Sequence, residues 1–155
     1  MRLVPGIFVR PRQNPYVGDV VPEVSVIVNA IAKSSGETIQ IHGAEAARRF
    51  KLTTQVPMSP VFNTSGPSRE FAIGKLKVAL RHVSNRKLQF AGKRSGLALS
   101  ALWYLGTERV GVKEIETVRQ RLTADEFEQL RAANMPGWLN RRFQQHEEVR
   151  VVTSG

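Results

Sequence analysis

The chain of 155 residues has no cysteine, only two aspartates and no long apolar run. Without cysteine, a disulfide framework, a thiol nucleophile, an iron–sulfur cluster and a thiolate zinc site are all excluded. Every apolar run is shorter than the roughly 18–20 residues of a membrane-spanning helix. The N-terminal segment carries one charge and is broken by Pro5, unlike a signal peptide. We therefore predict a cytoplasmic protein without a membrane association.

The scarcity of aspartate bears on catalysis. The two aspartates are Asp19 and Asp125, so residues 20–124 contain no aspartate. Metal-dependent nucleases and nucleotidyltransferases need clustered carboxylates, because hard cations bind oxygen ligands. The histidines lack metal-ligand spacing, and no serine lies in a nucleophile elbow. His82 is the best candidate for a base, although a histidine bonded to the backbone is the more common outcome. We predict no enzyme activity, no catalytic residue, no metal and no cofactor.

Positive charge is abundant and unevenly placed. The chain has 23 Lys and Arg against 13 Asp and Glu, a formal net charge of +10. Residues 59–111 hold nine basic and two acidic residues, whereas residues 112–155 hold seven of each. A nucleic-acid footprint concentrates basic residues in this way, so we expect it in the middle of the chain.

Hydrophobic periodicity predicts a mixture of helices and strands. Apolar residues recur at helical spacing in the ranges 22–33, 44–50, 97–105, 112–122, 124–134 and from Pro136 onward. Alternation predicts strands over 6–10, 38–41 and 60–64, and a hairpin of 70–73 with 75–81. We therefore expect one α+β domain over residues 1–155. Its small antiparallel sheet would include a basic hairpin and be packed by several helices, with a mainly helical C-terminal half and residues 147–155 as a candidate flexible tail.

The basic residues of the middle segment are candidates for phosphate contact, since guanidinium and ammonium groups both bind phosphate. We predict that nine residues bind nucleic acid: Arg69, Lys75, Lys77, Arg81, His82, Arg86, Lys87, Lys93 and Arg94. The aromatic residues nearby fit core positions, which favours contact with duplex phosphates over base stacking. Two alternatives to nucleic-acid binding stay open. In the first, the nine residues form an ordinary solvated surface without a ligand. In the second, Arg81 has a structural role and pairs with Glu70 across the hairpin.

Several short motifs occur in a distinctive order. The segments Thr64–Arg69 (TSGPSR), Leu80–Leu88 (LRHVSNRKL), Ala91-Gly92 and Gly96–Leu102 follow one another. Upstream stand Gly6-Ile7-Phe8, Pro11-Arg12, Asn14-Pro15, Gly43-Ala44 and Thr54–Pro57. Together they make the chain similar to the AbiEi-like antitoxins of type IV toxin–antitoxin, or abortive infection, systems.

The resemblance implies a bacterial, non-enzymatic regulator. Longer members have an N-terminal winged helix that binds and represses the operon promoter. Their C-terminal region counters a nucleotidyltransferase toxin, typically without forming a stable complex with it. Residues 1–20 of this chain resemble the wing strand or linker, and we expect the winged helix itself to be missing.

From the sequence we therefore expect an antitoxin-type regulator of transcription whose basic surface binds DNA or RNA. An alternative is a protein-interaction module, in which the same surface binds an acidic protein partner.

Overall fold

The computed structural model describes residues 22–154, so the predicted strand at 6–10 lies outside the described residues. Six α-helices, four strands and one 3-10 turn follow one another in this part. They are α1 (Pro22–Ser35), β1 (Ile39–Ile41), α2 (Gly43–Arg49), β2 (Val61–Thr64), β3 (Arg69–Ile73), β4 (Leu76–His82), η1 (Asn85–Leu88), α3 (Arg94–Leu105), α4 (Val112–Gln120), α5 (Ala124–Arg131) and α6 (Gly137–Ser154). The predicted α+β class and the mainly helical C-terminal half are confirmed.

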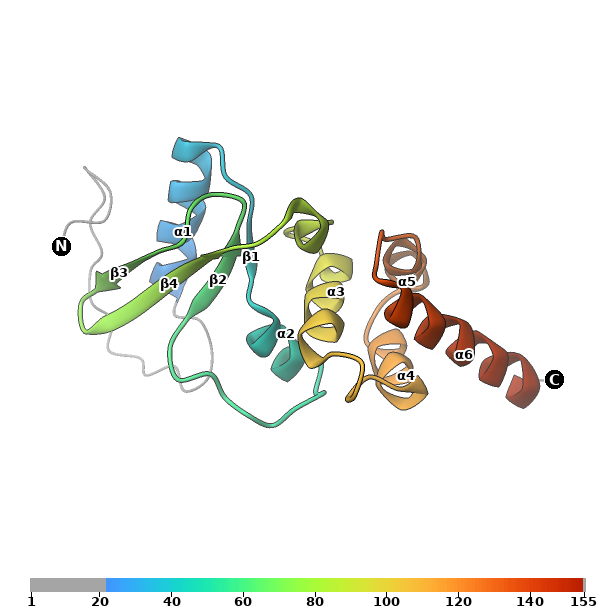
Figure 1. Ribbon diagram of the computed structural model, residues 1–155. Helices are drawn as coiled ribbons and strands as arrows, with labels where there is room; N and C mark the ends of the chain where they lie inside the picture. Colours follow the sequence, from blue (N-terminus) through green and yellow to red (C-terminus); the bar gives the residue numbers. More distant parts are fainter. Residues whose placement is uncertain (1–21, 155) are drawn as a thin grey trace.

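The four strands form one sheet in the order β1-β2-β4-β3 (Figure 1). β1 pairs antiparallel with β2, and β3 with β4, but β2 and β4 run parallel. The sheet is thus mixed, which corrects the expected antiparallel sheet. The reason lies in the order of the strands. After β2 the chain turns and forms β3 at the edge of the sheet, and it then turns again and forms β4 between β2 and β3. Because the chain reverses its direction at each of these two turns, β4 runs parallel to β2.

Helix α1 packs on one face of the sheet, as its apolar spacing predicts. Its buried stripe consists of Val24, Ile27, Val28 and Ile31. The stripe shares a core with four buried strand residues: Phe62, Phe71, Val78 and Leu80. We call this side of the sheet the covered face. The opposite side, which carries the alternate residues of β3 and β4, is the open face.

The helices α2 to α6 form a second core (Figure 1). Helix α3 lies at its centre, with Leu99 and Leu102 fully buried. Gly106 ends α3 with a φ of 81°, a conformation that glycine adopts without strain. Thr123 begins α5 with the predicted capping box, since its hydroxyl accepts from the N–H of Glu126 and the Glu126 carboxylate accepts from its N–H.

The C-terminal segment, residues 147–154, belongs to helix α6, where the sequence pattern predicts no helix. The flexibility expected of residues 147–155 stays a prediction. No glycine or proline follows Gly137 before the helix ends, and Glu147 forms ion pairs with Arg131 and Arg150. The Glu147–Arg150 pair is local to α6, whereas Arg131 reaches Glu147 from α5, a contact that an apolar pattern in the sequence does not record.

Candidate nucleic-acid interface

The open face of the β3–β4 hairpin carries exposed cations. Along β4 the chain alternates, so Val78 and Leu80 are buried on the covered face while Lys77 and Arg81 are exposed on the open face. Lys75 is exposed in the turn before β4. The predicted hairpin with one apolar and one basic face is therefore present.

The next two cations lie on the 3-10 turn η1, directly after β4. The Arg86 guanidinium carbon and the Lys87 Nζ each lie 5.4 Å from the centre of the Trp103 ring in α3. Arg86 Nε also donates to the carbonyl of Asn134 at 3.3 Å. Contacts of this kind orient a cation without removing its charge. We call Lys75, Lys77, Arg81, Arg86 and Lys87 the basic strip.

No acidic side chain neutralises the basic strip within residues 22–154. None of its five members forms an ion pair there. The alternative Arg81–Glu70 pair is not formed among the described residues, although the strand register, which sets Glu70 opposite Ala79, makes the two side chains diagonal neighbours on the open face. Glu70 is the single carboxylate on the open face of the described strands.

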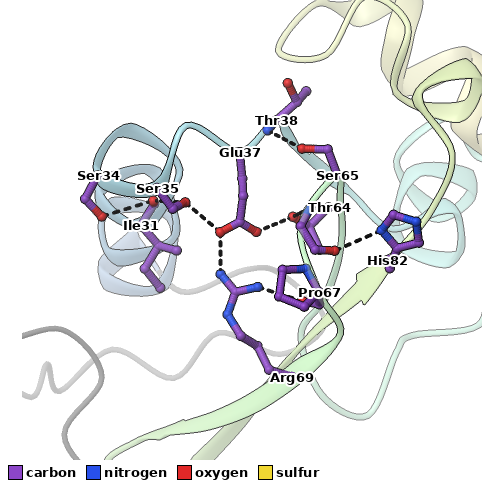
Figure 2. A network of polar contacts seen from close by, with 11 residues as sticks. Ile31, Ser34, Ser35, Glu37, Thr38, Thr64, Ser65, Pro67, Arg69 and His82 are labelled. Carbon is purple, nitrogen blue, oxygen red and sulfur yellow. Dashed lines mark hydrogen bonds and ion pairs between the residues drawn. The ribbon is translucent and has the colours of Figure 1, made fainter.

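Arg69 lies on the other side of the hairpin and is held in a polar network (Figure 2). Its Nη2 donates to Oε2 of Glu37 at 2.7 Å, and its Nη1 donates to the Pro67 carbonyl. The Glu37 carboxylate also accepts from the hydroxyls of Ser35 and Thr64, both at 2.6 Å. This Glu37 network ties the end of α1 to the sheet.

The charge of Glu37 is fixed by these donors. The hydrogen bond from Arg69 lowers the pKa of Glu37 to about 2; burial opposes the shift, and Ser35 and Thr64 reinforce it. The carboxylate approaches Gly66 so closely that a Cβ there would overlap the Glu37 side chain. Any larger residue at position 66 of the TSGPSR motif would therefore have to displace Glu37 from its network.

His82 belongs to the same corner of the molecule. Its Nδ1 hydrogen-bonds to the carbonyl of Gly66 at 2.9 Å, so the proton resides on Nδ1, and its backbone N–H donates to Ser68 Oγ. The side chain is exposed and faces away from the basic strip, since register places it beside Thr64 on the covered face. It follows the backbone-bonded outcome expected for such a histidine.

The last two predicted residues lie at the start of α3. Lys93 is exposed at the N-cap position. Arg94 donates to the carbonyl of Arg121 at 3.0 Å and lies 5.1 Å from the centre of the Phe50 ring. The structure thus brings five of the nine predicted residues into one strip and places the other four in different surroundings.

Sequence reasoning missed a small polar cavity beside the basic strip. It has a volume of about 130 Å³ and is lined in part by His42, Asn63, Lys87, Ser100 and Trp103. These residues come from four separate segments, so no local motif joins them. The one available signal is Asn63, a polar residue that directly follows the apolar Val61 and Phe62 in β2.

Two further findings concern residues 22–154 as a whole. Histidine and carboxylate side chains nowhere gather there in a group of three that would bind a metal ion. Every helix in the same range is too short or too polar to traverse a bilayer.

Fold and surface together define a small α+β protein. It presents, along a hairpin and the 3-10 turn after it, a row of cations that form no ion pair within the described residues. Sequence comparison assigns it further. The chain belongs to a family of unknown function, DUF6088, whose model matches residues 1–130 and so includes all nine predicted residues. No curated protein and no solved structure matches the chain significantly.

Proposed function

We propose that this protein is a non-enzymatic, antitoxin-type regulator that binds nucleic acid through the basic strip. The observation that carries the proposal is the run of five exposed cations along the β3–β4 turn, β4 and η1 that have no ion-pair partner within the described residues. Unpaired surface cations favour polyanions, because their charge is not already neutralised.

The dimensions of the strip suit a phosphate backbone. Lys77 and Arg81 are separated by about 13 Å along the extended strand. At about 3.4 Å per nucleotide, the same length of one DNA strand holds about four phosphates. The β4 strand therefore acts as a straight support for phosphate contacts, and binding is driven by release of counterions.

The regulatory role rests on the resemblance to AbiEi-like antitoxins. Two of the motifs that carry it contribute to these features. Leu80–Leu88 contains three of the five strip residues, and Thr64–Arg69 contains Thr64 and Arg69, which hydrogen-bond to Glu37. In this proposal the protein binds DNA or RNA, regulates transcription and counters a nucleotidyltransferase toxin without a stable complex. Co-expression with a nucleotidyltransferase encoded next to it tests this part: growth arrest by the toxin is relieved, and failure of relief contradicts the antitoxin role.

The binding surface is tested with Arg81→Ala plus Arg86→Ala. We expect affinity for duplex DNA or RNA to fall at least about tenfold and the dependence of log affinity on log salt to become shallower by about 2. Fluorescence anisotropy over a range of salt concentrations measures both quantities.

A matched control removes two arginines outside the strip, Arg109→Ala plus Arg141→Ala, both exposed. The control loses the same total charge, so an equal loss of affinity would assign binding to net charge rather than to the strip. Retention of one acidic protein after nuclease treatment, with no affinity for nucleic acid, would instead support the protein-interaction alternative.

A further inference from the structure

The polar cavity lies where the sheet meets the helical half. Its lining includes His42 after β1, Asn63 of β2, Lys87 of η1, and Ser100 and Trp103 of α3. The volume of about 130 Å³ is roughly ten times the 10–15 Å³ that admits one water molecule. Among the described residues, no carboxylate lines it. The cavity therefore has room for a small polar group in an environment of donors.

Two polar side chains at the cavity form no side-chain hydrogen bond within the described residues. Ser100 is 6% exposed, and its buried hydroxyl has no hydrogen-bond partner in residues 22–154. A serine within a helix usually bonds back to the preceding turn, and Ser100 does not. Asn63 is 9% exposed, and its side-chain amide forms no hydrogen bond with any described residue. Buried polar atoms are normally satisfied, so the unpartnered Ser100 hydroxyl, with the Asn63 amide beside the same cavity, points to a ligand.

His42 adds a third donor. Its Nδ1 accepts a hydrogen bond from the N–H of Ala44 at 3.1 Å, so the proton of the neutral ring lies on Nε2. Burial lowers the pKa of His42, and the charge of Arg81 lowers it further. The ring is thus neutral near pH 7 and offers Nε2–H as a donor, next to the positive charges of Arg81 and Lys87.

We propose that this cavity binds a phosphate monoester group. Ser100, Asn63 and His42 supply neutral donors to its oxygens, and Lys87 supplies a charge-assisted one. The phosphate is a monoester, linked to the rest of its molecule through one oxygen. A phosphodiester, whose chain continues on both sides of the phosphorus, could not reach side chains as deeply buried as Ser100 and Asn63. Lys87 belongs to both the cavity and the basic strip, so a nucleic-acid strand on the strip would place its terminal phosphate here. This assignment of the strand end rests on the proposed function.

Other ligand classes fit less well. A cation would meet no carboxylate in the lining and would lie beside Lys87. A stacked base would need the Trp103 ring, over which both Arg86 and Lys87 already lie. The chemistry of the lining therefore selects an anion with several acceptor oxygens.

Asn63→Asp is the most direct test, since it keeps the shape of the side chain and adds a negative charge. The probes are inorganic phosphate and one short duplex prepared with and without 5′-terminal phosphates. In the native protein, phosphate shifts the Trp103 indole NMR signal, and the phosphorylated duplex binds at least about tenfold more tightly than the other. Asn63→Asp abolishes both effects.

Ser100→Ala keeps the test valid should Asn63→Asp fail to fold. Because the Ser100 hydroxyl has no hydrogen-bond partner in residues 22–154, its removal leaves the melting temperature unchanged or raised but weakens phosphate binding several-fold. The matched control is Ser95→Ala on the same helix, whose hydroxyl donates to Gln129. That variant loses stability but keeps phosphate binding.

The outcomes separate this site from the proposed function. If the duplex binds equally with and without its terminal phosphates, and inorganic phosphate leaves the Trp103 signal in place, the cavity proposal is overturned while the basic strip stands. If inorganic phosphate binds in a manner sensitive to Asn63→Asp but no duplex binds, the cavity takes a free phosphate ester and the proposed function fails. The cavity proposal is also overturned if the Ser100→Ala variant has a lower melting temperature than the native protein and binds phosphate with unchanged affinity.

Discussion

The two faces of the β3–β4 hairpin use the same residue types for different purposes. On the covered face, Arg69 is held by Glu37 and helps to join α1 to the sheet. On the open face, Arg81 is exposed and has no ion pair within the described residues. Sequence position and charge give the two arginines equal standing as binding candidates. Their partners distinguish them, because an arginine already paired with a carboxylate offers little charge to a ligand.

The largest contrast between the faces concerns apolar burial. Leu80→Ala removes a side chain that is 1% exposed in the core beneath α1, and we expect a loss of about 2–5 kcal/mol in the free energy of unfolding. Its neighbour Arg81→Ala, on the open face, changes this free energy by no more than about 0.5 kcal/mol. Urea denaturation of both variants measures the contrast, and similar losses would show that the open face is also structural.

The next contrast compares two glutamates. Glu37→Ala removes the acceptor for Arg69, Ser35 and Thr64, and we expect a loss of about 2 kcal/mol. Glu70→Ala is the control, because Glu70 is exposed and has no ion pair within residues 22–154. Its effect stays within about 0.5 kcal/mol. Equal effects in thermal melts would contradict the structural role of the Glu37 network.

A smaller effect appears in the pH dependence of stability. The pKa of Glu37 is lowered to about 2 from an ordinary value of 4.5, so the unfolded chain takes up the proton first. The stabilisation is complete above about pH 4.5 and is lost as the pH falls toward 2. The difference in unfolding free energy between the native protein and Glu37→Gln therefore shrinks over this range. A difference that stays constant with pH would be inconsistent with an ionised, hydrogen-bonded Glu37.

The helical half contributes to the same acid transition. Glu116 accepts hydrogen bonds from Arg119 and the buried His146, and its pKa is also lowered to about 2, with Arg119 the largest cause. Some acid sensitivity therefore persists in Glu37→Gln. At each pH, the difference in unfolding free energy between the native protein and Glu37→Gln therefore isolates the contribution of Glu37 from that of Glu116.

The smallest expected effect on stability belongs to Lys77→Gln. Lys77 is exposed and without an ion pair among the described residues, so we expect no measurable change in melting temperature. Affinity for a duplex falls and its salt dependence becomes shallower by about 1. Lys113→Gln, an exposed lysine of α4, serves as the control and leaves binding unchanged. Equal loss of affinity in both variants would remove the distinction between the strip and the remaining surface.

Much of the fold follows from local patterns. The stripe of Val24 to Ile31 predicts α1, the alternation after Gly74 predicts β4, and the capping box at Thr123 predicts the start of α5. The parallel pairing of β2 with β4 has no such signal. The strand order depends on whether β3 or β4 of the hairpin pairs with β2, and this pairing joins segments that are distant in sequence.

The sequence by itself determined the α+β class, the position of the excess positive charge and the basic face of the hairpin, since periods of two and 3.6 and the density of lysine and arginine are local properties. Only the tertiary structure decided which cations remain unpaired. Glu37 reaches Arg69 across 32 residues, and the cavity joins His42, Asn63 and Ser100 from separate elements. Such partnerships arise when packing brings distant segments together, so no pattern within a single segment records them.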